Sequence, residues 1–172
     1  DEPGSVLLLA GHTYRYDIGS QKIRVVNEEE GMEIAGSMNA IAHNERFTYL
    51  HDSRTLYELD RTGNRLKKLF SCTGDTLLYS VSMDEKGDFW IGSNTGLGQY
   101  SIRPRQYHPL ITSLFGEASS VICDHRGKVW IGADHMLFAW MLQSRKFILF
   151  GESDGVIPNE YLAKPRLVSG KG

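Results

Sequence analysis

The sequence predicts an all-β protein assembled from a repeated unit of four short strands. The clearest sign is the stretch Gly87–Tyr100, whose features return forty residues later in Gly127–Trp140. Each copy opens on a charged turn, runs through an aromatic or β-branched segment to a glycine, breaks at a polar turn and begins a second apolar segment. Strand formers bounded by Gly, Asn and Asp in this way are typical of β-hairpins.

Two fainter copies precede these, in Val6–Ile18 and Phe47–Leu59. When the four copies are superposed at Val6, Phe47, Phe89 and Val129, the intervals between them are 41, 42 and 40 residues. A period of about forty residues with four short strands per unit is the signature of a β-propeller blade. The sequence therefore predicts about four four-stranded blades that belong to a larger β-propeller.

The repeat makes residues 1–172 a single propeller segment that begins at the second strand of a blade. Its units are approximately 6–37, 38–77, 78–119 and 120–162, followed by a final inner strand at 163–168. Strands are expected at 6–10, 13–18, 22–27, 38–42, 46–51, 55–60, 65–70, 78–83, 88–93, 97–102, 106–111, 120–123, 128–133, 136–142 and 145–150. The run Glu28–Glu30 is expected to be a solvated loop between units, and no long α-helix is expected because strands and turns use up the period.

Composition narrows the classes of function. The formal net charge of -2 and the pI near 6.3 argue against general affinity for nucleic acid or anionic membranes. There is no run of 18 apolar residues, so we expect no membrane contact by this segment. The first residues lack the basic and apolar regions of a signal peptide.

The apolar pattern indicates sheets that are covered on both faces. Phe89–Ile91 and Val129–Ile131 do not alternate with polar residues, as a strand with one wet face would. We therefore expect the tryptophan in each segment to pack between blades rather than to serve as a ligand platform, with its indole N–H finding a partner. Gly92 and Gly132 are expected where a neighbouring sheet comes too close for a side chain.

These residues resemble a known family. The pattern of Asp84–Tyr100, an Asp-x-x-Gly turn followed by Trp-Ile-Gly and Gly-Leu, is similar to the two-component regulator propeller repeat; Asp124–Trp140 matches its first half. Phe150–Ala163, with Asp-Gly-Val-Ile-Pro-Asn-Glu-Tyr, resembles the sequence before the last blade of those sensors. The match is strong over 81–163 and weak over 6–70. The resemblance implies the periplasmic sensor region of a hybrid two-component histidine kinase, in which many members detect glycan fragments and the propellers have more than four blades.

Polar residues that follow the second strand of each unit are the candidate ligand-binding set, because propellers usually bind ligands at a rim. They are His12, His51, Asp52, Asn94, Asp134 and His135. The alternative is that polar residues occupy these turns because turns are wet. No two of these residues have the short spacing of a metal motif, so no metal is expected. The glycine-rich Gly92–Gly98 lies between two strands and lacks the Lys-Ser or Lys-Thr pair of a phosphate loop.

The sequence thus predicts a non-catalytic, ligand-binding sensory segment without a cofactor, whose ligand is a small carbohydrate. The main alternative is a protein-interaction propeller without a small ligand, and a third is a propeller enzyme such as a lyase. A chain of this kind needs the missing blades or a second copy of itself as a partner to cover its outer faces. Cys72 and Cys123 are expected at opposite levels of their blades, about 13–16 Å apart along the strand direction and too far for a disulfide.

Overall fold

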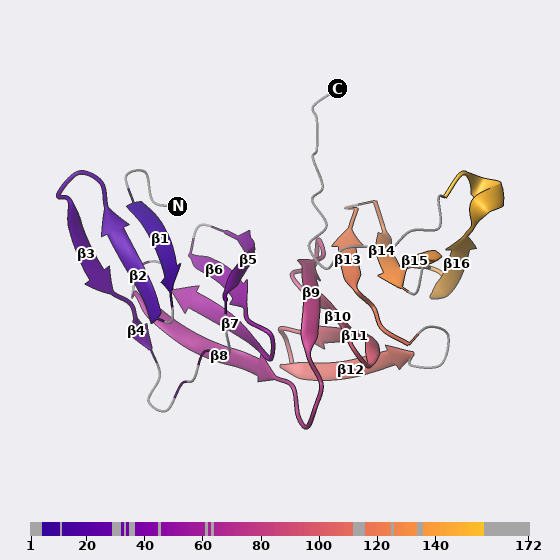
Figure 1. The fold of residues 1–172 in the computed structure, drawn as a ribbon, viewed down its shortest axis with the longest axis horizontal. Coiled ribbons are helices and arrows are strands. Elements are labelled where there is room, and N and C mark those ends of the chain that lie inside the picture. Colours follow the sequence, from indigo (N-terminus) through magenta and orange to yellow (C-terminus); the bar gives the residue numbers. More distant parts are fainter. Residues whose placement is uncertain are drawn as a thin grey trace. The chain divides into compact units, whose positions relative to one another are not determined.

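The computed structural model describes residues 5–10, 12–28, 32, 34, 37–44, 46–60, 62, 64–111, 116–124, 126–133 and 136–156. Within these ranges the chain forms sixteen strands and one short 3-10 helix, so the predicted all-β propeller-blade fold is confirmed (Figure 1). The chain divides into two compact units, residues 1–73 and 74–172, at the link between the second and third repeats. Among the described residues, no helix has the length and apolar character needed to cross a membrane.

The first unit contains two sheets. Blade 1 has three strands in the order β1-β2-β3, with bounds Ser5–Ala10, His12–Asp17 and Lys22–Val25. Blade 2 has the order β4-β8-β7-β6-β5, where the strands are Asn27–Glu28, Arg65–Ser71, Thr55–Asp60, Phe47–His51 and Asn39–His43. Its core joins Leu50, Tyr57, Leu59 and Leu66 to Val26 from the link after β3.

The second unit contains two four-stranded antiparallel blades with the strands in chain order. Blade 3 consists of β9 (Leu78–Met83), β10 (Phe89–Ser93), β11 (Gly96–Ser101) and β12 (Gln106–Ile111). Blade 4 consists of β13 (Ser120–Cys123), β14 (Lys128–Ala133), β15 (Met136–Met141) and β16 (Lys146–Phe150), followed by the 3-10 helix Glu152–Asp154. These bounds agree with the predicted strands to within a residue. The predicted strand at 163–168 lies outside the described residues.

The prediction of a strand over 22–27 is wrong at its end. β3 ends at Val25, and Asn27–Glu28 form a separate short strand, β4, that pairs in parallel with Arg65 and Leu66 of β8. Glu28 is therefore part of a sheet, not of a loop. One of its carboxylate oxygens accepts the backbone N–H of Thr13 at 3.1 Å. Strand β4 thus places a residue of the first repeat at the outer edge of the second blade.

The turn between the last two strands of each blade fixes the true repeat register. In all four blades it ends on a residue with positive φ that is not glycine: Gln21, Asn64, Arg105 and Arg145. Tyr100 and Leu59 both lie five residues before this turn residue, and their partners on the second strand are Phe89 and Thr48. Thr48, not Phe47, therefore corresponds to Phe89. The predicted superposition was therefore one residue out in the second repeat. Tyr49, which follows Thr48, is therefore the counterpart of Trp90. The shift matters because successive side chains in a strand face opposite ways, so an error of one residue assigns each side chain to the wrong face.

A single aspartate organises the tight turn before the second strand of blades 3 and 4. Asp84 Oδ1 accepts the backbone N–H groups of Lys86 and Asp88 at 2.9 and 3.1 Å, and Asp84 Oδ2 accepts the indole N–H of Trp90 at 3.1 Å. Asp124 Oδ2 accepts the indole N–H of Trp130 at 3.2 Å in the same way. The Asp-x-x-Gly-x-x-Trp pattern is thus a physical unit, in which the carboxylate that holds the turn also supplies the partner that a buried indole needs.

The inner strands of blades 3 and 4 are joined through serine hydroxyls. Ser80 Oγ donates to the carbonyl of Val121 at 3.3 Å and accepts the N–H of the same residue at 3.1 Å, while Ser82 Oγ accepts the N–H of Cys123 at 3.0 Å. A Cβ placed on Gly92 would lie 2.5 Å from the carbonyl oxygen of Ala118. The predicted close approach at Gly92 is confirmed.

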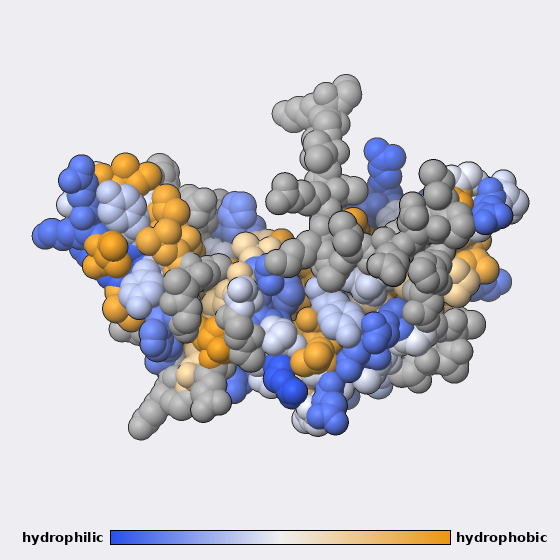
Figure 2. All heavy atoms as spheres, in the orientation of Figure 1, coloured by the Kyte–Doolittle hydropathy of each residue, from blue (hydrophilic) through white to orange (hydrophobic). Residues whose placement is uncertain are grey.

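Trp90 packs between blades 3 and 4, as predicted. It is 2% exposed and shares a core with Val121, Cys123 and Trp140 of blade 4. Trp130, its counterpart in blade 4, is only half-buried and stacks at 5.2 Å between ring centroids on Phe150. Apolar side chains reach the surface over the blade 1 strands and at β16 (Figure 2). The most exposed of these are Ile23, Val25, Leu149, Ile18, Ile148, Val6 and Leu8.

Candidate functional site

The predicted candidates in the first unit have structural partners. His12 is the first residue of β2 rather than a turn residue, and its exposed Nδ1 lies 3.3 Å from Glu28 Oε2. His51 ends β6, is buried, and its Nδ1 lies 2.9 Å from the backbone oxygen of Asp52. Both histidines therefore lie within strands, where side chains follow the pleat of the sheet.

Asp52 has the most complete set of contacts. Its Oδ1 accepts the backbone N–H groups of Arg54 and Thr55, both at 2.7 Å, and its Oδ2 accepts the hydroxyl of Tyr57 at 2.7 Å. The residue is 1% exposed. Burial is the main cause that raises the pKa of Tyr57 well above its usual range, and the hydrogen bond to Asp52 adds to it. These contacts are enough to explain Asp52 as the organiser of the β6–β7 turn.

Asn94 plays a similar part in the second unit. Its Oδ1 accepts the backbone N–H of Leu77 at 2.8 Å, and its Nδ2 donates to the carbonyl of Asp75 at 3.0 Å, so that it ties the β10–β11 turn to the segment that enters β9. Asp134 and His135 lie outside the described residues. The structure places His12, His51 and Asp52 in one unit and Asn94 in the other, and a ligand-binding role for the set stays a prediction.

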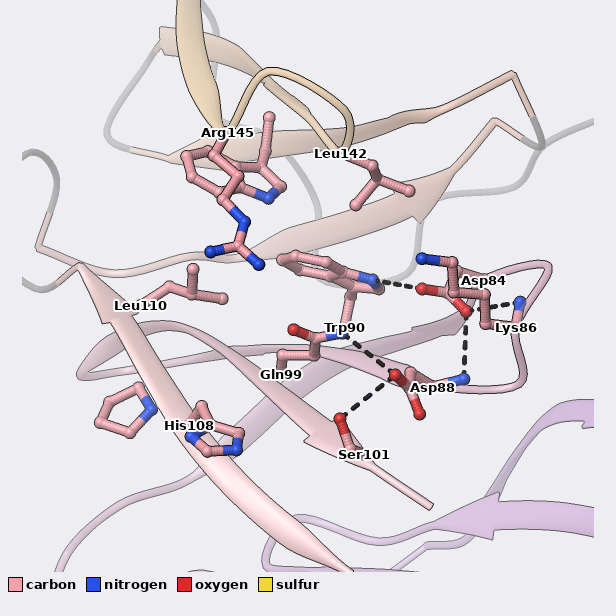
Figure 3. A pocket seen from close by; sticks show the side chains of 12 residues that line it. Asp84, Lys86, Asp88, Trp90, Gln99, Ser101, His108, Leu110, Leu142 and Arg145 are labelled. Atoms are coloured by element: carbon pink, nitrogen blue, oxygen red, sulfur yellow. Dashed lines mark hydrogen bonds between the residues drawn. The ribbon is translucent and has the colours of Figure 1, made fainter. Parts of the chain in front are cut away.

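The second unit contains a groove that the sequence did not single out. It has a volume of about 560 Å³ and lies between β10–β12 of blade 3 and the end of β15 with the turn before β16 in blade 4 (Figure 3). The residues that line it are Asp84, Lys86, Asp88, Trp90, Gln99, Ser101, His108, Pro109, Leu110, Trp140, Leu142 and Arg145. A groove of this size is large enough for a small ligand.

One wall of the groove is held rigidly by Asp88. Its Oδ2 accepts from Gln99 Nε2 at 3.3 Å and from Ser101 Oγ at 3.2 Å, while its Oδ1 accepts the backbone N–H of Ile102 at 3.1 Å. Together with the bond from the Trp90 indole to Asp84, this network fixes the polar side chains beneath the opening. The acidic groups of the groove are therefore already hydrogen-bonded, and they leave cationic groups to meet a ligand.

Three basic side chains at the groove have no hydrogen bond or ion pair with the residues that the structure describes: Lys86, His108 and Arg145. His108 and Arg145 are exposed, as is Lys86. Arg145 occupies the positive-φ position of the β15–β16 turn, with φ of 53°, and its guanidinium extends toward Leu110 and the Trp90 ring (Figure 3). Guanidinium, ammonium and imidazole groups can donate to hydroxyl, carboxylate or sulfate oxygens.

This set was not found from the sequence because its members come from different blades. His108 lies on β12, whereas Arg145 follows β15, and no local motif connects them. The only sequence signal is periodic: Arg105 and Arg145 occupy the same turn position in blades 3 and 4, but only Arg145 lines the groove.

Metal ligands and cysteine thiols would be further sources of chemistry among the described residues. These residues hold no group of three or more His, Cys, Asp or Glu side chains placed to bind a metal ion. Burial raises the pKa of the Cys123 thiol to about 12 and that of Cys72 to about 11, so both stay protonated at neutral pH. Both cysteines are free in the structure.

Comparisons with known proteins agree with the propeller fold. No family model and no curated protein sequence matches the chain. The chain is similar to the extracellular domain of BT4673 from B. thetaiotaomicron, described as a hybrid two component system, with a TM-score of 0.67 and 15% identity over 87% of this chain and 21% of that one. The extracellular domain of BT3049 from the same organism, described likewise, gives 0.64 and 13% over 86% and 22%.

A structure of YCF48 bound to D1 peptide is also similar, with a TM-score of 0.65 and 13% identity over 92% of this chain and 54% of that one. The chain spans about a fifth of the length of the two sensor domains. At these identities the similarity shows the fold. The resemblance to the propeller region of hybrid two-component sensors is confirmed at that level: the chain has the β-propeller blades found in their extracellular domains.

Proposed function

We propose that this chain is a non-catalytic, ligand-binding segment of a sensory propeller, and that the groove over Trp90 and Trp140 takes a small carbohydrate-type ligand. The observation that carries the proposal is the groove itself, which combines a volume of about 560 Å³ with three basic side chains that have no described partner. The similarity in fold to extracellular sensor domains supports the sensory role and a periplasmic location.

The chemistry of the lining favours a saccharide. Leu110, Leu142 and Pro109 provide apolar surface for the C–H faces of a sugar ring, and Trp90 and Trp140 also line the groove. Lys86, His108 and Arg145 provide hydrogen-bond donors around this surface. Because the groove's carboxylates are already bonded, the remaining donors favour a saccharide that carries a carboxylate or sulfate group.

A binding experiment with a matched control tests the proposal. In calorimetric titration, oligosaccharides that carry uronate or sulfate groups should bind the wild-type chain more tightly than neutral oligosaccharides do. Arg145→Gln should weaken that binding at least about tenfold, as expected when a charge-assisted hydrogen bond is lost. Arg105→Gln changes the equivalent turn of blade 3, outside the groove, and should leave the affinity unchanged. Equal affinities of the two variants would move the site elsewhere.

The second candidate is a peptide-docking propeller, favoured by the similar fold of the YCF48 structure that holds a D1 peptide. Wild-type protein that binds none of the saccharides would contradict the first proposal and leave this one. The two outcomes separate because saccharide binding must depend on Arg145, whereas a docked peptide would use the rim of more than one blade.

A further inference from the structure

The outward face of blade 4, meaning the face that does not contact blade 3, repeats the features by which blade 3 receives blade 4. On blade 3 the receiving positions are Ser80 and Gly92, which are paired across β9 and β10. On blade 4 the same positions are occupied by Ser120 and Gly132, which are paired across β13 and β14. A serine hydroxyl and a glycine without a side chain therefore recur where the next inner strand would arrive.

The hydroxyl of Ser120 has no hydrogen bond with any described residue, although the residue is only 8% exposed. Its counterpart Ser80 is 5% exposed and makes two bonds to the backbone of Val121. Ser120 Oγ is not among the fully buried polar atoms that lack a partner, so it is accessible and can bond to the backbone of an arriving strand as Ser80 Oγ does.

The remaining side chains of this face are more apolar than those of the equivalent face on blade 3. Ile122 stands where blade 3 has Ser82, Ala139 where it has Gln99, and Ile148 where it has His108. Ile148 is 43% exposed, and Trp130 is half-buried where Trp90 is 2% exposed. The face thus has the character of an interior surface.

The segment after the 3-10 helix carries the pattern of an inner strand and its turn. Ala118, Val121, Cys123 and Gly127 are spaced as Ala163, Arg166, Val168 and Gly172 are, each 45 residues further on. Ser169 then falls where Asp124 accepts the turn's N–H groups, a part that a serine hydroxyl can also play. Twelve residues lie between Phe150, the end of β16, and Ala163, which is ample chain to return to β13.

We propose that residues 163–168 dock on the outward face of blade 4 as the inner strand of a further blade, with the backbone of Arg166 hydrogen-bonded to Ser120 Oγ. Ala163 then passes over Gly132 as Ala118 passes over Gly92. Because Ile122 replaces Ser82, the second serine bond has no counterpart, and apolar contact with Ile122 and Trp130 takes its place. This inference does not depend on the proposed ligand or groove.

Hydrogen exchange of the intact chain, read residue by residue, tests the docking. The amide of Arg166 should be protected, and Ser120→Ala should lower that protection about tenfold, the value expected for loss of one hydrogen bond. Ser82→Ala is the calibration, because it removes a bond of the same kind from the Cys123 amide. An unprotected Arg166 amide in the wild-type chain, or protection that Ser120→Ala leaves unchanged, would overturn the proposal.

A second variant tests the close approach. Gly132→Val should abolish protection across 163–168 while β15 and β16 stay protected. Gly151→Val is the matched control, since a Cβ at Gly151 meets no atom within 4 Å. The measurement is repeated over a hundredfold range of protein concentration. Protection that rises with concentration would mean that a second copy covers this face, and the proposal would be wrong.

Discussion

Trp90 and Trp130 occupy the same position in consecutive blades, follow the same Asp-x-x-Gly turn, and donate the same indole bond at 3.1 and 3.2 Å. Yet Trp90 is 2% exposed, whereas Trp130 is half-buried. The local unit is therefore complete in both blades, and only the covering differs. Blade 4 lies over Trp90, and the described residues place no sheet over the equivalent surface of blade 4. The comparison separates what a repeat builds for itself from what its neighbour must supply.

The largest effect expected from this difference is on the tryptophans themselves. Trp90→Ala should lower the free energy of unfolding by about 3–5 kcal/mol, as for other fully buried large side chains. Trp130→Ala should cost at least about 1 kcal/mol less, because less of its surface is removed from solvent. Urea denaturation of both variants measures the two values. The single strand 163–168 proposed above covers Trp130 less completely than the four strands of blade 4 cover Trp90. Equal losses would therefore mean that a full sheet covers the outward face of blade 4.

Replacing the turn aspartates should also destabilise blade 3 more than blade 4, with smaller losses in the free energy of unfolding than the tryptophans give. Asp84 is 6% exposed and its carboxylate accepts three hydrogen bonds. Asp84→Ala should lower the free energy of unfolding by about 2–3 kcal/mol, because it leaves the buried indole N–H of Trp90 unpaired. Asp124→Ala should cost about 1–2 kcal/mol, because water can reach the half-buried groups that it leaves. Chemical denaturation monitored by tryptophan fluorescence checks both. A larger loss for Asp124→Ala would contradict the difference in covering.

Asp124 also predicts a dependence on pH. Partial burial by itself would raise the pKa of its carboxyl group, but the N–H groups of Arg126 and Lys128 and the indole N–H of Trp130 together bring the pKa below its usual value. A carboxyl group with a lowered folded-state pKa stabilises the protein above its unfolded-state pKa of about 3.9, and that stability is lost as the pH falls through the folded-state value. Stability measured between pH 5 and pH 2 should fall less steeply for Asp124→Asn than for wild type. Parallel curves would refute the assignment.

The smallest difference is expected at the outer turns, where blades 3 and 4 are alike. Arg105 and Arg145 have φ of 68° and 53°, a conformation that costs a non-glycine residue about 1 kcal/mol. Arg105→Gly and Arg145→Gly should therefore raise stability equally, by about 0.5 kcal/mol once the added freedom of the unfolded chain is counted. Thermal midpoints of the two variants provide the measurement. Unequal shifts would show that Arg145 has a contact that Arg105 lacks.

Much of the fold followed from the sequence because the information is local. Strands 78–83, 106–111, 120–123 and 128–133 were predicted at the observed bounds, and all but 106–111 lie between turns that contain Gly or Asp. The turn aspartates and the close approach at Gly92 followed from the same repeat. The repeat also predicted the propeller fold, which comparison with solved sensor domains confirms.

The register of the second repeat could not be read correctly for a physical reason. Asn44 makes a turn there that is one residue shorter than that of Asp84, since the N–H of Asn44 bonds to the carbonyl of Phe47 whereas that of Asp84 bonds to the carbonyl of Asp88. A strand that is apolar on both faces has no alternation of apolar and polar residues. The sequence pattern therefore cannot distinguish the correct register from one that is shifted by one residue. The parallel pairing of β4 could not be predicted either, because a strand of two residues is too short to show an alternating pattern.

By itself, then, the sequence determined the blade: its strands, its turns and the aspartates that form them, all of which depend on residues within about forty positions of one another. The structure added that Asp84 and Asp124 are the partners of the Trp90 and Trp130 indoles. Only the tertiary structure decided which blade faces are covered and where a ligand could enter. The groove at Arg145 and His108 is made by residues of two blades, and their proximity depends on how one sheet stacks on the next. That stacking is set by side-chain size and hydrogen bonding across the interface, at Gly92, Ser80 and Ser82, and no local pattern encodes it.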